Sequence, residues 1–247
     1  MNIVLNSFLA VTDTVSNQIE EFTLKYIHRW FPNDYIICLH DVTDTCNSKY
    51  DITPEKLRGF FLSCDRKLFI RLNDMISSSQ SQRGNTNRYT ITFDDGLESV
   101  YTYVYPLMKE LEIPFTCYIT TSSIDKDGYL SSDQIRSLAS DPLCEIGSHM
   151  VSHRRTRGLS VKEILDEWST SKDVLLGITE KCIKHAALPY GSLLSCSRKS
   201  IRLAFEAGYS SVATTSARPF KGRSRILPRC TYKMNFDVIA FVCKCKT

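Results

Sequence analysis

The sequence predicts an α/β protein, a single-domain (β/α) barrel of about seven strands. Short β-rich runs alternate with segments whose apolar residues recur at helical spacing, which is typical of parallel βα units. A length of 247 residues suits one barrel of this kind without an internal domain boundary. The β-rich runs are residues 35–39, 89–93, 115–120, 145–147, 183–188, 210–213 and 226–227.

Helices are expected between these strands. Apolar residues repeat at helical spacing from Val100 to Leu111, and Pro114 then stops the run. Residues 160–163 form a capping-box pattern, Ser-x-x-Glu, that begins another helix. The residues of this helix that we expect to face inward are Ile164, Leu165, Trp168, Leu175 and Leu176. A further helix begins near Arg198 and ends at Gly208.

Two segments are expected to stand apart from the regular barrel. Residues 1–34 are predicted to form an N-terminal helical segment packed on the barrel domain, which spans 35–247. The apolar pattern of that segment, Ile19, Phe22, Tyr26, Ile27 and Trp30, leaves peripheral contact with a membrane surface open as an alternative. Residues 77–87 are polar or glycine throughout and predict a flexible surface loop.

Composition excludes several classes of protein. Hydrophobic residues at 43% and charged residues at 23% are ordinary values for a globular domain. No stretch reaches about 18 apolar residues, so we expect no transmembrane segment. A net charge of +4 without a nucleic-acid-binding motif gives no reason to expect a nucleic acid partner. Ten cysteines without a C-x-x-C pair indicate reduced thiols, and with no secretory signal pattern they favour a cytoplasmic protein.

The chemistry begins at Thr92-Phe93-Asp94-Asp95-Gly96. Neighbouring residues of a continuous strand point to opposite faces, so the two carboxylates share a site only if the strand ends there. Gly96 permits that sharp turn, and one carboxylate can then bind a metal while the other reaches the water that the metal polarises. Taken alone, the same residues fit a helix N-cap followed by a first-turn acid equally well.

A pair of histidines, His149 and His153, follows the expected strand at 145–147. On a helical turn, residues four apart project from one face, so both imidazoles would hold a single borderline-soft cation such as zinc. An isolated H-x-x-x-H pair also occurs on solvated helices, but its place after a strand favours a site. Two imidazoles and one carboxylate would leave coordination positions open for water and a substrate oxygen.

These two segments, followed by Ala187-Leu188-Pro189-Tyr190-Gly191, resemble in order the NodB-like polysaccharide deacetylases of carbohydrate esterase family four. The likeness spans most of the chain and includes residues 129–134, 145–149 and 206–209, where that family usually has similar sequence. The resemblance implies the NodB-homology fold, a distorted (β/α) barrel.

The resemblance also implies roles for the acidic and histidine residues. Asp95 would join His149 and His153 on one divalent metal ion, while Asp94 would serve as the general base. Zinc is the first choice for the ion, with cobalt, nickel, manganese or iron as alternatives. In the family, the backbone amide of the tyrosine in the third motif, here Tyr190, helps to hold the oxyanion, and its ring lines the sugar groove.

The third motif also contains two residues that would shape its loop, and this chain lacks an arginine and a histidine that many family members carry. Pro189 and Gly191 would shape the loop that carries Tyr190. Many members carry an arginine at the position of Ala187, together with an aspartate partner that has no visible counterpart here, so the base must be oriented in another way. The late leucine-x-histidine that supplies the general acid in many members is also missing, because residues 225–228 contain no histidine.

His40 is the candidate general acid. It ends an apolar strand, so a barrel would bring it beside the metal, and it resembles the histidine that poly-N-acetylglucosamine deacetylases carry before the aspartate pair. Asp41 would orient it. A strand-end histidine bonded to Asp41 without a catalytic role is the alternative. His28 and His185 are expected to be structural.

The implied activity is metal-dependent removal of an N-acetyl group from an amino sugar in a glycan, glycolipid or sugar-nucleotide, in surface-polysaccharide biosynthesis. The partner would be the N-acetylated carbohydrate itself. Hydrolysis of a non-sugar cyclic amide and a catalytically silent, glycan-binding barrel stay open as alternatives. A basic group near the C-terminus is expected in a solvated loop or, as an alternative, on a substrate phosphate. Its members are Arg218, Lys221, Arg223, Arg225 and Arg229.

Overall fold

The computed structural model describes residues 33–78, 86–192, 195–222 and 224–233. The predicted N-terminal helical segment, including His28, and most of the predicted loop at 77–87 lie outside the described residues. The eight cysteines that are described are all free thiols. Among the described helices, none has the length and apolar character needed to cross a bilayer.

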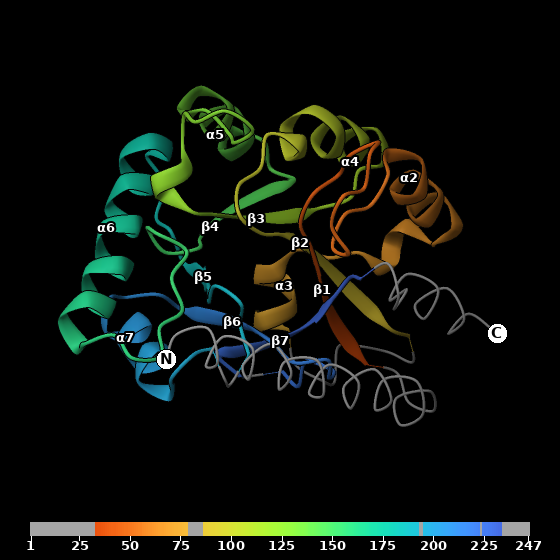
Figure 1. Ribbon diagram of the computed structural model, residues 1–247. Coiled ribbons are helices and arrows are strands. Elements are labelled where there is room, and N and C mark those ends of the chain that lie inside the picture. The colour runs from red at the N-terminus through yellow and green to blue at the C-terminus, as the bar shows by residue number, and fades with distance from the viewer. Residues whose placement is uncertain (1–32, 79–85, 193–194, 223, 234–247) are drawn as a thin grey trace.

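Seven parallel strands form a closed barrel at the centre of the protein (Figure 1). Each strand pairs with its neighbours in sequence, and β7 closes the ring by pairing with β1. The strands are β1 (Asp34–Leu39), β2 (Arg88–Phe93), β3 (Phe115–Ile119), β4 (Cys144–Ser148), β5 (His185–Ala187), β6 (Ser211–Thr215) and β7 (Ile226–Thr231). The predicted barrel is therefore confirmed, and every predicted β-rich run contributes one of its strands.

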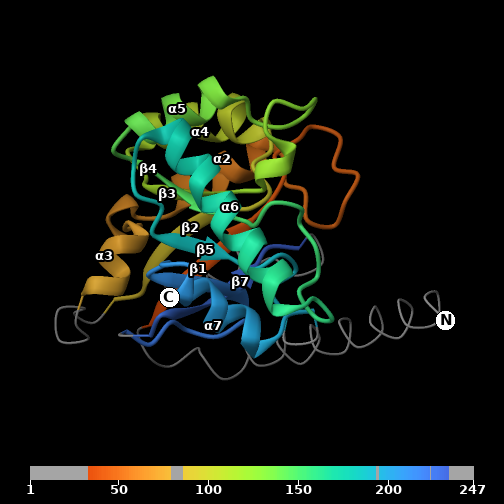
Figure 2. The ribbon, with the colours of Figure 1, turned by 90° about the vertical axis from the view of Figure 1, so that its left-hand side faces the viewer.

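Helices surround the barrel (Figures 1 and 2). They are α2 (Pro54–Ser63), α3 (Leu72–Ser77), α4 (Tyr105–Leu111), α5 (Ser132–Ser140), α6 (Val161–Thr179) and α7 (Arg198–Glu206). The capping box predicted at the start of α6 forms in both directions, between Ser160 and Glu163. The helix predicted from Val100 begins instead as a π-helical turn, Val100–Val104, and becomes α-helical only at Tyr105. Pro106 follows at once and has no N–H to donate to the preceding turn.

Side chains alternate between the two faces of the barrel wall. Outward residues such as Tyr35 and Ile37 join the large core between the strands and the helices. A second, smaller cluster gathers inward residues of the strands with residues of α3, which covers one end of the barrel in Figure 1. Its buried members are Ile36, Leu72, Met75, Tyr118, Ala187, Ala213, Phe220 and Leu227. Apolar packing thus closes one end of the barrel.

The inward face of α6 differs in part from the prediction. Ile164, Trp168 and Leu175 are buried, but the expectation for Leu176 is wrong, because this side chain is 46% exposed. One residue of helix corresponds to about 100° of rotation, which turns Leu176 away from the stripe that Leu175 continues. The stripe also contains two buried polar residues, Glu167 and Ser171.

Candidate active site

The chemically interesting side chains gather at the carboxyl ends of the strands, the end of a (β/α) barrel where active sites are built. Asp94 and Asp95 follow β2, and His149 follows β4. His40 follows β1, and the segment 188–191 follows β5. Four loops that are distant in sequence therefore meet at one end of the barrel, and the loop after β4 also carries His153, four residues beyond His149.

The turn after β2 separates the two aspartates. Asp95 and Gly96 both adopt left-handed backbone conformations, with φ of 72° and 75°. Aspartate tolerates this region better than most residues, and at Gly96 an added Cβ would lie 3.1 Å from Cγ2 of Ile119. The strand thus ends at the aspartates, as predicted. The N-cap alternative is not what forms, because the Asp94 carboxylate is bonded to Arg229 and Cys38.

Asp95, His149 and His153 lie close enough to share one ion. Asp95 Oδ1 is 3.5 Å from His149 Nε2 and 3.2 Å from His153 Nε2. Ligand atoms about 2.0–2.1 Å from a tetrahedrally coordinated zinc are separated by about 3.3–3.4 Å, so this spacing fits such an ion. Asp95 Oδ1 is buried and accepts no hydrogen bond from the described residues, as expected of an atom placed to bind a cation.

The two histidines differ in burial and in hydrogen bonding. His149 Nδ1 lies 2.9 Å from the carbonyl oxygen of Ala187, which turns Nε2 toward Asp95. Burial lowers the pKa of His149 to about 4, so the ring is neutral, the form that binds metals. The side chains of His153 and Asp95 are 33% and 27% exposed, which leaves one side of the triad open to solvent.

The backbone that carries the histidines is not the helical turn that the sequence suggested. Residues 149–153 form an irregular loop in which Met150 and His153 have left-handed φ values of 65° and 53°. The imidazole centroids are nevertheless 5.0 Å apart. The interpretation of the four-residue spacing as helical is therefore wrong, because hydrogen bonds from neighbouring strands and from α6 determine this loop.

Arg229 belongs to the site, although its place in the sequence predicted a solvated loop or a contact with a substrate phosphate. It lies in β7 with its side chain fully buried, and Nη1 and Nη2 donate to the two carboxylate oxygens of Asp94 at 2.6 and 2.7 Å. Nη1 also donates to Oγ1 of Thr92 at 3.2 Å. Arg229 is thus neither in a solvated loop nor placed to meet a substrate phosphate.

The prediction for Arg229 is wrong because the strand that carries it is longer than expected. The strand was expected to end at Leu227, whereas β7 continues to Thr231 through Pro228. Extending the two-residue alternation from Leu227 would have placed Arg229 on the inner face. Arg225, by contrast, precedes β7 and donates to the carbonyls of Tyr209 and Ser210, so it lies at the opposite end from the aspartates. Arg223 lies outside the described residues.

The electrostatics of Asp94 follow from this pairing. Burial opposes ionisation of the carboxyl, but the adjacent Arg229 guanidinium outweighs it and holds the pKa of Asp94 well below its usual range. Burial raises the pKa of the Cys38 thiol, which stays protonated and donates to Asp94 Oδ2 at 3.4 Å. Asp94 is therefore an oriented carboxylate that remains ionised at neutral pH.

His40 also faces this group. One atom each of Cys38, His40 and Asp94 lie within 4.8 Å of one another. Metal binding by these three would place the ion beside the guanidinium that already holds Asp94, which disfavours a second cation. The ring of Tyr50 packs on His40, with centroids 5.2 Å apart. Asp41 makes no hydrogen bond with His40 among the described residues, and His40 Nδ1 is buried without a partner there.

The third loop places Tyr190 beside the triad. Tyr190 and Gly191 both have positive φ, and a Cβ at Gly191 would lie 2.5 Å from the backbone nitrogen of Thr215. The Tyr190 ring is half exposed and packs on His153, with centroids 4.9 Å apart. Thr215 fixes the turn by donating from Oγ1 to the Tyr190 carbonyl at 2.9 Å. The exposed ring therefore forms one wall of the open side of the site.

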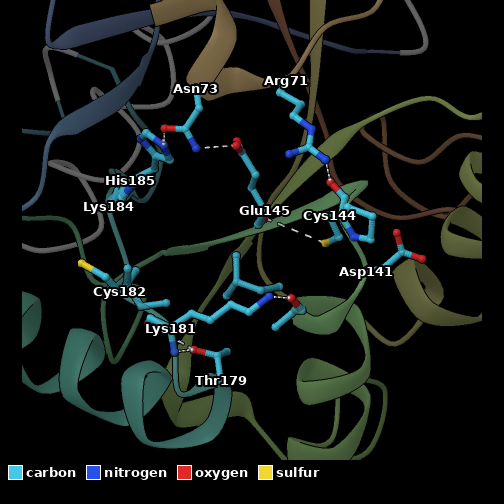
Figure 3. Close-up of a pocket in the computed structure, with 14 residues that line it drawn as sticks. Arg71, Asn73, Asp141, Cys144, Glu145, Thr179, Lys181, Cys182, Lys184 and His185 are labelled. Carbon is cyan, nitrogen blue, oxygen red and sulfur yellow. Dashed lines mark hydrogen bonds between the residues drawn. The ribbon is translucent and has the colours of Figure 1, made fainter. Parts of the chain in front are cut away.

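A cavity of about 400 Å³ lies elsewhere, where β4 and β5 begin (Figure 3). Its buried histidine, His185, lies 3.1 Å from Oδ1 of Asn73 through Nε2 and 2.8 Å from Oγ of Ser211 through Nδ1. Asn73 in turn bonds to Glu145 (Figure 3). His185 thus has partners on both ring nitrogens at the end of the barrel opposite the metal-ligand triad, in agreement with a structural role.

The fold and the site together define a class of protein: a (β/α) barrel with one carboxylate and two imidazoles, a set used by metal hydrolases, at the carboxyl ends of its strands. The profile of the family described as Polysaccharide deacetylase matches residues 81–214, more than half of the chain. This chain belongs to the polysaccharide deacetylase family, as the motif order predicted.

A curated relative and two solved structures are similar to this chain. The Bacillus subtilis protein YxkH, named for the same family, is 24% identical over 137 residues, which cover 56% of this chain and 48% of YxkH. The chain thus matches about half the length of that curated relative. Streptococcus pyogenes deacetylase PplD, solved in complex with acetate, superposes with a TM-score of 0.75 at 16% identity and covers 87% of this chain and 98% of its own. A de-N-acetylase from Aggregatibacter actinomycetemcomitans gives 0.71 at 16% identity, covering 85% and 99%. The two structural matches confirm the NodB-type barrel fold.

Proposed function

We propose that the protein is a metal-dependent hydrolase that removes an N-acetyl group from an amino sugar during the synthesis of a surface polysaccharide. The observation that carries this proposal is the convergence of Asp95, His149 and His153 around one point, with Asp94 held ionised beside them. Family membership supports a carbohydrate substrate. The acetate bound to PplD and the name of the Aggregatibacter enzyme support an N-acetyl group as the one removed.

Asp95, His149 and His153 would hold a divalent ion, with zinc the best match to this mixed nitrogen and oxygen set. The bound ion would supply Lewis acidity, polarising the acyl carbonyl and making water more acidic. Cobalt, nickel, manganese and iron are the other ions that suit the set. His149 is buried and held by Ala187, whereas His153 and Asp95 border solvent, so substrate would approach from their side.

Asp94 is the proposed general base. A carboxylate offers about four lone-pair positions, of which Arg229 occupies two and Cys38 a third. One position is left to accept a proton from the attacking water. The low pKa of Asp94 makes it a weak base, so the proton transfer depends on water that is already acidified. Arg229 would keep the carboxylate oriented throughout.

His40 is the proposed general acid, and the loop of Tyr190 the proposed oxyanion site. The buried Nδ1 of His40 has no hydrogen-bond partner among the described residues, so no bond seen there would oppose the proton exchange that a general acid needs. The Tyr190 amide donates no hydrogen bond to any described residue, so it is available to the developing oxyanion. Pro189 and Gly191 would fix the direction of that amide. This chain resembles the poly-N-acetylglucosamine deacetylases in that the proposed acid histidine precedes the aspartate pair.

Acetate release from a panel of N-acetylated carbohydrates tests the proposal. The panel should contain a glycan, a lipid-linked sugar and a nucleotide-linked sugar, each incubated with the zinc form and the metal-free form of the protein. We expect release only with metal, and the preferred member of the panel will identify the form of the substrate. Release that is unaffected by metal removal would refute the proposed chemistry.

The same panel separates the two alternatives. Adding a cyclic ureide tests hydrolysis of a non-sugar amide. Binding of a glycan without release of acetate, measured in the zinc form, would instead indicate a silent carbohydrate-binding barrel. Release that is lost on substituting Asp94 excludes both alternatives for the sugar that is cleaved.

A further inference from the structure

The loop between the two histidines is held from outside the barrel by a carboxylate of α6. Glu167 is 9% exposed and lies in the buried stripe of that helix. Its Oε2 accepts hydrogen bonds from the backbone amides of Val151 and Ser152, each at 2.9 Å. Its Oε1 accepts a hydrogen bond from the Ser152 hydroxyl. Three donors from the two residues just before His153 therefore converge on one side chain.

This loop needs such support because its backbone is unfavourable. Met150 and His153 both occupy the left-handed region, with φ of 65° and 53°, which is unfavourable for a residue other than glycine. Val151 and Ser152, which Glu167 binds, are the residues between them. A second residue of the α6 stripe, Ser171, forms a 2.7 Å hydrogen bond with Ser148, the last residue of β4, directly before the loop. Helix α6 thus fixes both ends of the segment that carries the imidazoles.

The bonding of Glu167 is unusual for a buried carboxylate. Buried acids are normally paired with a cation or neutralised, because an isolated charge is expensive to remove from water. The ion pairs of the described residues include none with Glu167, which is stabilised by the loop amides and hydroxyl alone. Its partners are all donors, which is the arrangement that an ionised carboxylate requires.

We infer that Glu167 is a positioning residue for the metal centre: its carboxylate holds the left-handed loop so that His153 meets Asp95 and His149, and its negative charge favours a cation there. This inference rests on the proposed metal-dependent function. It assigns a role to a residue of α6 that contacts neither the ion site nor the substrate side. Outer partners of this kind typically change metal affinity by about 10- to 100-fold.

Cobalt binding tests the inference without relying on turnover. Co²⁺ is titrated into metal-free protein, and both its affinity and its visible absorption spectrum are recorded, because the spectrum reports the coordination geometry. Glu167→Gln keeps the shape of the side chain and removes its charge. We expect Co²⁺ affinity to fall by about 10- to 100-fold with an altered spectrum. Ser152→Ala removes one of the three donors from an exposed position, and we expect a smaller loss in the same direction.

Asp166→Asn is the matched control, since it makes the same change of charge at the exposed neighbouring position of α6. It should bind Co²⁺ like the native protein. Native affinity and a native spectrum in both Glu167→Gln and Ser152→Ala would overturn the inference while leaving the proposed function intact. If Glu167→Gln does not fold, the Co²⁺ affinity and spectrum of Ser152→Ala test the inference, and native values in that variant would overturn it. Failure of the native protein to bind Co²⁺ or Zn²⁺ would instead refute the proposed function, and this inference with it.

Discussion

Arg229 binds both carboxylate oxygens of Asp94 inside the barrel, across 135 residues of sequence. Neither side chain is more than 4% exposed, so the pair is almost completely removed from water. Two parallel N–H···O bonds fix the plane of the carboxylate as well as its position. Arginine suits this role better than lysine, which would offer one point charge and no matched fork.

Removing Arg229 should therefore be more damaging than removing the whole pair. Arg229→Met leaves an unpaired buried carboxylate, and we expect the free energy of unfolding to fall by about 3–5 kcal/mol. Adding Asp94→Asn to that variant should restore a large part of the loss, because no buried charge remains. Urea unfolding of the native protein, Arg229→Met and the double variant measures this. Arg225→Met, an exposed cation at the other end of the barrel, is the control, and an equal loss in it would contradict the argument.

Metal retention should separate the two neighbouring aspartates. Asp95→Asn, His149→Ala and His153→Ala each remove a proposed ligand, and we expect metal content well below one equivalent in each. Asp94→Asn should retain the metal and lose turnover, because it removes the proton acceptor and leaves the three ligand atoms in place. Elemental analysis of the purified variants checks the first outcome and acetate release the second. Equal metal loss in Asp94→Asn and Asp95→Asn would show that the roles are wrongly divided.

His40→Gln should slow catalysis without affecting metal content. Loss of a general acid typically costs 10²- to 10⁴-fold in rate, so we expect kcat to fall within about that range. Steady-state kinetics and elemental analysis on one preparation give both quantities. Tyr50→Phe keeps the ring that packs on His40 and serves as the control. A kcat for His40→Gln within a factor of two of the native value would show that His40 is not the general acid.

Stability should decline as the pH falls because of His185. Burial lowers the pKa of this imidazole to about 4, whereas it is near 6.5 in an unfolded chain. A lowered histidine pKa means that the unfolded chain takes up the proton first. The contribution is therefore fully present above about pH 6.5 and is lost as the pH falls toward 4.

The size of this effect can be measured by comparison with His185→Gln. At pH 5 the native protein should have lost about 2 kcal/mol of unfolding free energy through this group, relative to pH 8. The Gln variant starts from a lower stability at pH 8 but lacks this part of the decline. Denaturant unfolding of metal-free samples at both pH values gives the difference between the two proteins. Parallel pH dependence in the two would show that His185 does not carry the proton uptake.

Local sequence was sufficient to place all seven strands, although not to find the end of β7, and it was sufficient for the aspartates of the site. The apolar β-rich runs ended where polar, turn-forming residues began, and these ends became the carboxyl rim of the barrel. Asp94, Asp95 and Gly96 required a strand to stop between two carboxylates, and the left-handed backbone at Asp95 and Gly96 does this. The capping box of α6 formed because both its partners lie within one helical turn.

Local sequence failed where distant elements determine a conformation. The spacing of His149 and His153 is compatible with a helix, but the bonds from Glu167, Ala187 and the end of β3 impose a loop. Glu167 had a recognisable signal, a charged residue at a buried position of a helical stripe. Arg229 had one as well, a charge in phase with Leu227 along a strand that continued further than expected.

By itself, the sequence determined the order of the seven strands, the end of the barrel that carries the aspartates and histidines, and a strand end at Asp94 and Asp95, since these follow from short-range periodicity and turn chemistry. Only the tertiary structure decided which cation holds Asp94 and what holds the histidine loop. The physical reason is that a buried charge and a left-handed backbone are stable only with hydrogen-bond partners, and these partners are distant in sequence. Closure of the barrel brings β7 beside β1, and the packing of α6 brings Glu167 to the loop after β4.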